Sequence, residues 1–250
     1  MLVPRDFLAR PATEVAPELL GCVLEHETAA GLVAVELTEV EAYAGQADPA
    51  SHAYRGMTRR NAVMFGPPGH AYVYFTYGMH FCVNVVCSGA GSVSAVLLRA
   101  GAVIEGEDLA RARRSNRRPG PGRNQETSPP ASPRQAPLAW RDLARGPARL
   151  CQALDIDRSL DGADLCVAGS PLRLRPARLD ASAGGRTTVR SGTGLAPRDG
   201  PVETPRTIAR GPRVGVSMAA EVPWRFWLAG DPTVSEYRKH VPRQRKPVTP

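Results

Sequence analysis

The sequence predicts a single mixed α+β domain with an antiparallel sheet and a protruding β-hairpin. Segments with the period-two alternation of β-strands outnumber segments with helical spacing. No regular succession of strand, helix and strand appears, as a parallel sheet would require, and no internal repeat is visible. With 250 residues, 42% of them hydrophobic, the chain can bury a core of its own without a metal or a disulfide.

The first elements are expected close to the N-terminus. "ATEVAPELL", residues 12–20, has the pattern of a short helix capped by Thr13. Residues 19–27 and 31–43 are β-rich runs, which predict an antiparallel pair. Three later segments have the pattern of regular elements: a helix at 146–156, and strands at 212–218 ("PRVGVSM") and 224–230 ("WRFWLAG").

The segment "AYVYFTYGMHFCVNVVC", residues 71–87, predicts the hairpin. Two β-rich runs flank Gly78 and Met79, a two-residue Gly-X connection that suits a type II′ turn. Strict alternation from that turn would place Tyr74 and Asn84 on opposite faces, unless a bulge or a sharp twist intervenes.

The tip of this hairpin carries Tyr77, Met79 and His80, large side chains where hairpins usually place small polar ones. Such residues either pack under a neighbouring loop or act as a wedge that is pushed into a base stack. The strongly basic composition favours the wedge.

Three segments lack the pattern of a packed element. Residues 111–137 are rich in Arg, Pro and Ser, and residues 176–212 are rich in Gly and Pro, so both are expected to be mobile insertions. Residues 239–250 form a basic tail, so the domain is expected to span residues 1–238.

The net charge of +8 indicates a polyanionic partner, such as nucleic acid or an anionic membrane surface. Arginine supplies nearly all of it, because the only lysines are Lys239 and Lys246; codon usage explains that preference equally well. No run of eighteen apolar residues is present to cross a membrane, and the N-terminal residues lack the apolar core of a signal peptide. The five cysteines contain no CxxC pair, so reduced and mostly buried thiols are expected rather than a metal site.

Residues 33–43, "VAVELTEVEAY", combine a core-facing row with acidic side chains. One alternating face of this strand carries, in order, Val33, Val35, Leu37, Glu39, Glu41 and Tyr43. Two carboxylates and a phenol in line with apolar residues indicate a strand that leaves the core and enters a cavity.

Aromatic residues gather just after this strand. Five of the six tyrosines fall between residues 43 and 77: Tyr43, Tyr54, Tyr72, Tyr74 and Tyr77. Flat aromatics beside His52 and the two carboxylates, in a basic protein, favour a pocket for a planar base. Each face-on contact is worth roughly 1–3 kcal/mol, so two or three offset the extrusion of a base from a duplex. No basic helix is evident that would read a groove instead.

The chain resembles the alkyladenine (3-methyladenine) DNA glycosylase family, monofunctional enzymes that excise damaged purines. The matching blocks are "VELTEVEAY", "SHAYRG", "RRNAVMF", "PGHAYVYFTYGMHFCVNVV", "AVLLRA", "GPARLCQALDI" and "RVGVS", in the order of the family. The resemblance implies a single α+β domain whose β-hairpin probes the minor groove of DNA.

The resemblance also implies roles for the residues around the predicted pocket. Glu41 aligns with the general base, and Arg99 aligns with the arginine that helps to hold the catalytic water. "RVGV", around Val214 and Val216, aligns with a segment whose backbone carbonyl touches that water. Glu39 is expected to support its surroundings rather than to act as a second catalyst.

The remaining alignments concern the DNA. Tyr43, His52 and Tyr74 align with residues that stack on or hydrogen-bond the flipped base. Asn84 aligns with the pocket asparagine that disfavours the amino group of normal guanine. Tyr77 aligns with the intercalating tyrosine, and Met79 lies beside it at the tip.

The expected reaction is hydrolysis of the N-glycosidic bond by water that Glu41 activates, without a metal or a cofactor. The expected substrate is double-stranded DNA with 3-methyladenine, 7-methylguanine, hypoxanthine or ethenoadenine, whose removal initiates base excision repair. We expect a cytoplasmic, nucleoid-associated monomer with no membrane contact and no obligate protein partner.

Three other functions compete with this interpretation. A noncatalytic DNA-lesion-binding protein could share the fold, but it would be expected to lack Glu41 or Arg99. A base deaminase needs an HxE and PCxxC zinc set, which the sequence does not contain. A formyltransferase-like enzyme is suggested by fold analogy alone, and no folate-binding feature is recognisable.

Overall fold

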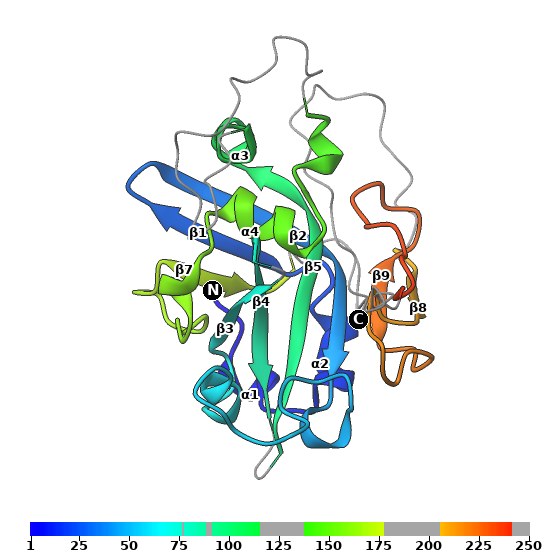
Figure 1. The fold of residues 1–250 in the computed structure, drawn as a ribbon. Helices are drawn as coiled ribbons and strands as arrows, with labels where there is room; N and C mark the ends of the chain where they lie inside the picture. The colour runs from blue at the N-terminus through cyan, green and yellow to red at the C-terminus, as the bar shows by residue number, and fades with distance from the viewer. Residues whose placement is uncertain (77, 89–91, 116–137, 178–205, 242–250) are drawn as a thin grey trace, which may run out of the picture.

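The computed structural model describes residues 1–76, 78–88, 92–115, 138–177 and 206–241 (Figure 1). The described helices are α1 (Arg5–Leu8), α2 (Ala12–Glu18), α3 (Glu107–Ser115) and α4 (Pro147–Leu154), with short 3-10 turns η1 (Gly45–Ala47), η2 (Ala62–Phe65), η4 (Trp140–Asp142) and η5 (Arg158–Leu160). The described strands are β1 (Val23–Thr28), β2 (Gly31–Tyr43), β3 (Ala71–Thr76), β4 (His80–Cys87), β5 (Ser94–Glu105), β6 (Ala144–Arg145), β7 (Leu172–Arg175), β8 (Ile208–Gly211) and β9 (Arg225–Leu228).

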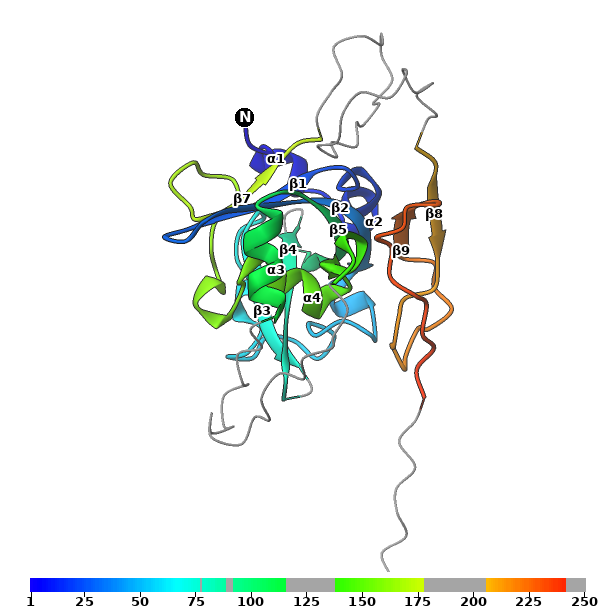
Figure 2. The same cartoon turned by 90° about the horizontal axis from the view of Figure 1, so that it is seen from above.

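The nine described strands form one antiparallel sheet, so the predicted α+β class is confirmed. The main order is β3-β4-β5-β2-β1-β7, while β6 pairs with β5 and the β8–β9 hairpin joins the edge of β2. In Figures 1 and 2, α4 covers one face of the sheet and α1 and α2 cover the other. Figure 2 also shows the β3–β4 hairpin extending beyond α3 and α4.

The apolar core lies between these layers. Helix α2 contributes Val15 and Ala16 to it, and α4 contributes Leu150 and Leu154. All five cysteines are free thiols, four of them buried, as the sequence predicted. None of the helices in the described part of the chain has the length and the apolar character needed to cross a membrane.

Strands β2 and β5 are irregular where the polar residues begin. Thr38 of β2 and Arg99 of β5 both fall between paired residues, at shifts of register around Glu39. Beyond the irregularity, Val40 and Ala42 belong to the apolar core, so alternation directs Glu39 and Glu41 to the opposite face. Both carboxylates are fully buried, and polar partners surround them.

The predicted two-residue connection of the hairpin is wrong. The last pair of β3 and β4 is Thr76 with His80, so three residues connect the strands. The Met79 N–H donates to the Thr76 carbonyl over 3.1 Å, and Gly78 has a φ of +67°, which favours glycine. His80 therefore pairs with Thr76, whereas a two-residue turn would have paired it with residue 77.

The corrected register removes the conflict between Tyr74 and Asn84. Tyr72 pairs with Asn84, and Tyr74 pairs with Cys82. Residues directly opposite share a face, and so do residues two apart on one strand. All four side chains therefore lie on one face of the hairpin, and no bulge is required between these residues.

Several predicted boundaries also change. The helix at 12–18 begins after Pro11, which makes no side-chain capping bond, so Thr13 lies inside the first turn and does not cap it. The antiparallel pair, the helix near 146–156 and the strand near 224–230 are confirmed as β1–β2, α4 and β9.

Two predictions of irregular or extended structure are wrong in part. Residues 212–218 are not a strand; the strand in this region is β8 (Ile208–Gly211), which lies inside the mobile insertion predicted at 176–212. Residues 111–115 belong to helix α3, whose amphipathic turns pack on α4. Most of the insertions predicted at 111–137 and 176–212, and most of the tail at 239–250, lie outside the described residues.

Candidate functional site

A cavity of about 430 Å³ opens where β2, β4 and β5 meet two loops. Strand residues on its wall are Tyr43, Tyr72, Tyr74, Thr76, Cys82, Asn84, Ala95, Leu97 and Arg99. Loop residues on its wall include 49–52 and 214–218. A cavity of this size with aromatic walls and a few polar groups is typical of a small-molecule or base-binding site.

Glu41 lies directly behind this wall and has no exposed surface. Its Oε2 accepts a hydrogen bond from the Tyr43 hydroxyl over 2.8 Å, and its Oε1 accepts one from the Val214 N–H over 2.7 Å. Arg99 Nη1 lies 3.2 Å from the same Oε1. These three partners all line the cavity, so they connect the buried carboxylate to it.

Arg99 bridges the two glutamates of β2. Its Nε donates to Glu39 Oε1 over 2.8 Å, while Nη1 faces Glu41. Burial alone would lower the pKa of Arg99, but the carboxylates of Glu41 and Glu39 raise it. The irregular pairing of β5 at Arg99 is of the kind that re-aims a side chain near a site.

Glu39 is the hub of a second buried network. It accepts hydrogen bonds from Arg99 Nε, from Arg225 Nε at 2.7 Å, and from the backbone and side chain of Ser235 at 2.7 and 3.0 Å. Burial raises the pKa of Glu39, but the two guanidiniums and the hydroxyl outweigh it, so the pKa lies below its usual value. Four donors hold the carboxylate, three at Oε1 and one at Oε2, which fits the expected supporting position.

One wall of the cavity is an aromatic cluster formed by His52, Tyr72 and Tyr74. The two tyrosine rings stack with centroids 5.4 Å apart, and His52 meets Tyr74 edge-on at 4.5 Å. The His52 Nδ1 lies 3.0 Å from the Tyr72 hydroxyl. Burial, followed by the charge of Arg60, lowers the pKa of His52. Asn84 donates its amide N–H to the Tyr72 carbonyl over 3.1 Å, which fixes its orientation in the wall.

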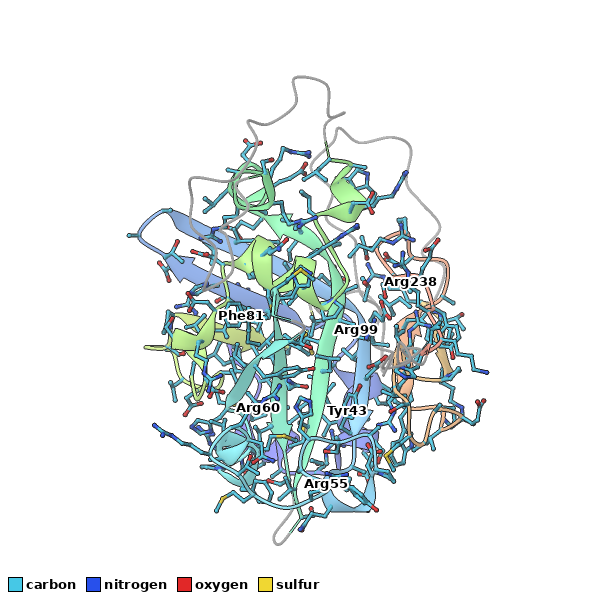
Figure 3. All side chains as sticks on the ribbon, in the orientation of Figure 1. Tyr43, Arg55, Arg60, Phe81, Arg99 and Arg238 are labelled. Atoms are coloured by element: carbon cyan, nitrogen blue, oxygen red, sulfur yellow. The ribbon has the colours of Figure 1, made fainter. Side chains whose placement is uncertain are left out.

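Cationic and exposed residues surround this aromatic wall. The guanidinium of Arg60 lies 5.8 Å from the centre of the Tyr74 ring. Figure 3 shows Arg99 and Tyr43 over the central strands, with Arg60 and Arg55 at the lower part of the same view. Met79, in the hairpin connection, is 60% exposed. Tyr77 lies outside the described residues.

The structure thus places Tyr43, His52, Tyr74, Asn84 and Arg99 around one cavity, with Glu41 behind it. Sequence reasoning missed four polar residues that hold this arrangement. They are Asp48, Arg213, Arg225 and Ser235, all of which bond to the site or to its walls. The sequence contains only a weak sign of the three charged residues, because each is a single charge inside its segment: "GQADPAS", "PRVGV" and "PWRFW".

The sequence of the chain is similar to those of known proteins. Residues 6–232 match the model of the family described as Methylpurine-DNA glycosylase (MPG). Relatives that carry the name 3-methyladenine DNA glycosylase include one of Streptomyces avermitilis, 49% identical over 97% of this chain and 94% of its own. One of Leifsonia xyli is 47% identical over 94% and 92% of the two chains, and one of Methanocella arvoryzae is 40% identical over 94% and 96%.

The family match gives the class of the protein: an enzyme that acts on DNA, a hydrolase of N-glycosyl bonds. The chain belongs to the methylpurine-DNA glycosylase family, because the family model covers most of its length and the identities are high. The resemblance seen in the sequence is therefore confirmed, and with it the assignment to DNA repair by base excision.

Proposed function

We propose that the chain flips a damaged purine out of duplex DNA into the cavity and hydrolyses its N-glycosidic bond with water activated by Glu41. The observation that carries this proposal is the bonding of Glu41. A carboxylate has about four acceptor sites, and Tyr43, Val214 and Arg99 occupy three of them. One site is left, in a dry environment, for the proton of a single water.

The surroundings of Glu41 suit the transition state of this reaction. Loss of the base leaves positive charge on the sugar, and a buried anion stabilises that charge more strongly than an exposed one. Glu41 has no exposed surface, and the guanidinium of Arg99 is only 6% exposed. The attacking water is proposed to bind at Oε2, which carries the free acceptor site because Val214 and Arg99 both bond Oε1.

The aromatic wall supports binding of alkylated purines. Alkylation at a ring nitrogen gives 3-methyladenine and 7-methylguanine a positive charge, and a cation is attracted to the faces of Tyr and Trp rings. Tyr43, Tyr72 and Tyr74 present such rings to the cavity. Neutral hypoxanthine and ethenoadenine are proposed to bind by stacking and by hydrogen bonds to the polar wall residues.

The competing function is recognition of lesions without catalysis. It is disfavoured because Glu41 and Arg99 are both present and 3.2 Å apart, in contact with cavity residues. The two functions separate in one assay: methylated duplex DNA is incubated with the protein in EDTA, and free bases are resolved by chromatography. A glycosylase releases methylated purine and leaves alkali-labile sites. Retention of methylated DNA without release of base would reject the proposed function.

A further inference from the structure

A buried ion pair, Arg213 with Asp48, lies beside the loops of the cavity wall. The side chains of Arg213 and Asp48 are both 0% exposed, and Arg213 is the largest fully buried residue in the described part of the chain. The pair is bidentate, with Nη1 to Oδ2 at 2.5 Å and Nη2 to Oδ1 at 2.9 Å. Buried ion pairs are weak contributors to stability compared with apolar side chains of similar size, so stability alone explains this pair poorly.

Two aromatic rings enclose the guanidinium. It lies 4.7 Å from the centre of the Tyr43 ring and 5.2 Å from that of Trp224. Its Nη1 also donates to the Ala42 carbonyl over 3.1 Å. The guanidinium therefore fixes both the backbone and the ring of the residues that follow Glu41 in β2.

The same ion pair joins two loops of the cavity wall. Asp48 accepts hydrogen bonds from the N–H groups of Ala44 and Ala50, and so shapes the turn that leads into the wall at 49–52. Arg213 directly precedes the wall at 214–218. One bidentate contact thus sets the distance between the two loops.

We infer that Arg213 is a positioning residue for Glu41, an inference that rests on the proposed role of Glu41 as the base. Two of the three donors on Glu41 depend on Arg213. Val214, which is bonded to Oε1, is its neighbour in the chain, and Tyr43, which is bonded to Oε2, lies against its guanidinium. The bonds of Arg213 go to Asp48, Ala42 and Ala219, and it does not line the cavity, so it is inferred to act through Val214 and Tyr43.

Substitution of Arg213 by Lys tests the inference. Lysine keeps the charge but loses the planar fork and the stacking, so the wall should shift and single-turnover base release should fall by about 10²-fold. The dissociation constant for lesion DNA should change far less. Arg173→Lys is the matched control, because Arg173 pairs with Glu25 and Glu27 outside the cavity. It should keep the parental rate.

A second variant covers the possibility that Arg213→Lys does not fold. Trp224→Leu removes one ring from the guanidinium and leaves the ion pair intact, so it should lower the rate in the same direction by a smaller factor. Folding of each variant is checked by circular dichroism and thermal unfolding. A folded Arg213→Lys or Trp224→Leu protein with the parental rate would overturn the inference.

The double variant with Glu41→Gln separates this inference from the proposed function. If Arg213 acts through Glu41, adding Arg213→Lys to Glu41→Gln should slow the residual reaction by no more than about threefold. A full additional 10²-fold loss would overturn the positioning role and leave Glu41 as the base. A Glu41→Gln protein with the parental rate would remove the base assignment, and the inference with it.

Discussion

The backbone N–H of Val214 donates a hydrogen bond to Oε1 of Glu41 over 2.7 Å, although 173 positions separate the two residues in the chain. This bond links the loop between β8 and β9 to β2, the longest of the described strands, at the point where chemistry is proposed. It also explains why residues 212–218 do not form the predicted strand: the Val214 N–H bonds to a side chain and not to a neighbouring strand.

The buried network around Glu39 should make stability depend on acidity. Folding lowers the pKa of Glu39, because Arg99 and Arg225 outweigh the effect of burial. The folded state therefore keeps this carboxylate ionised more strongly than the unfolded chain does. Its stabilisation is complete above the ordinary glutamate pKa of 4.5 and is lost as the pH falls through the lower folded-state pKa.

Denaturant unfolding of the parent and of Glu39→Gln at a series of pH values measures this effect. The difference in free energy of unfolding between the two proteins should be constant at neutral pH and should shrink on acidification below 4.5. A difference that does not change with pH would show that the ionisation of Glu39 is not coupled to folding.

The turn after β2 has no room for a side chain at Gly45. A Cβ atom there would lie 1.6 Å from the Val93 carbonyl oxygen, and φ is +61°. Gly56→Ala is the matched control, since Gly56 also has a positive φ, of +90°, but no neighbour within 4 Å. Gly56→Ala should cost about 1–2 kcal/mol, and Gly45→Ala on the order of 3–5 kcal/mol. Equal shifts in thermal unfolding would contradict the close contact.

The hairpin connection is the expected wedge. Tyr77→Ala should weaken binding to lesion duplexes by roughly 1–3 kcal/mol, because a wedge stabilises the flipped state. The loss should be smaller on mismatched lesions, whose bases are extruded at lower cost. Binding titrations on paired and mismatched duplexes make the comparison, and Met57→Ala, at a residue 67% exposed, serves as a surface control. Equal losses on both duplexes would argue against a wedge.

The reaction should stop at the abasic site. Strand-nicking glycosylases attack the sugar with an amine, usually that of a lysine, whereas the only lysines here are Lys239 and Lys246. Arginine stays protonated in proteins and cannot replace lysine. Borohydride should therefore trap no covalent adduct between the protein and DNA. An adduct that persists after deletion of residues 239–250 would contradict the monofunctional reaction.

The periodicity of apolar residues predicted those strands and helices that form from one continuous segment of the chain. The β1–β2 pair, α4 and β9 follow from periodicity within a few residues of their observed bounds. The register of the β3–β4 hairpin was not predicted correctly. Gly78-Met79 suits a two-residue turn, but in the structure Thr76 pairs with His80, so the turn has three residues. One residue in a turn reverses which side chains share a face, and here it brings Tyr74 and Asn84 together.

The candidate site also contains residues that the sequence could predict and residues that it could not. Residues that touch the cavity carry the family motifs and could be found by resemblance. The Arg213–Asp48 pair could not, because its members are 165 positions apart and each is a single charge in an otherwise ordinary segment. Neither segment alone indicates which residue its charge will pair with. The two residues meet only in the folded chain, where the Arg213 guanidinium also lies against Tyr43.

The central claim is that Glu41 activates the water that releases the base. Single-turnover release of methylated purine from duplex DNA in EDTA, by the parent and by Glu41→Gln, measures it directly. The variant should bind lesion DNA as the parent does and release base about 10²–10⁴-fold more slowly, because glutamine fills the same space but cannot accept a proton. Release within a few-fold of the parent would contradict the claim and direct attention to Glu39, the other buried carboxylate in contact with Arg99.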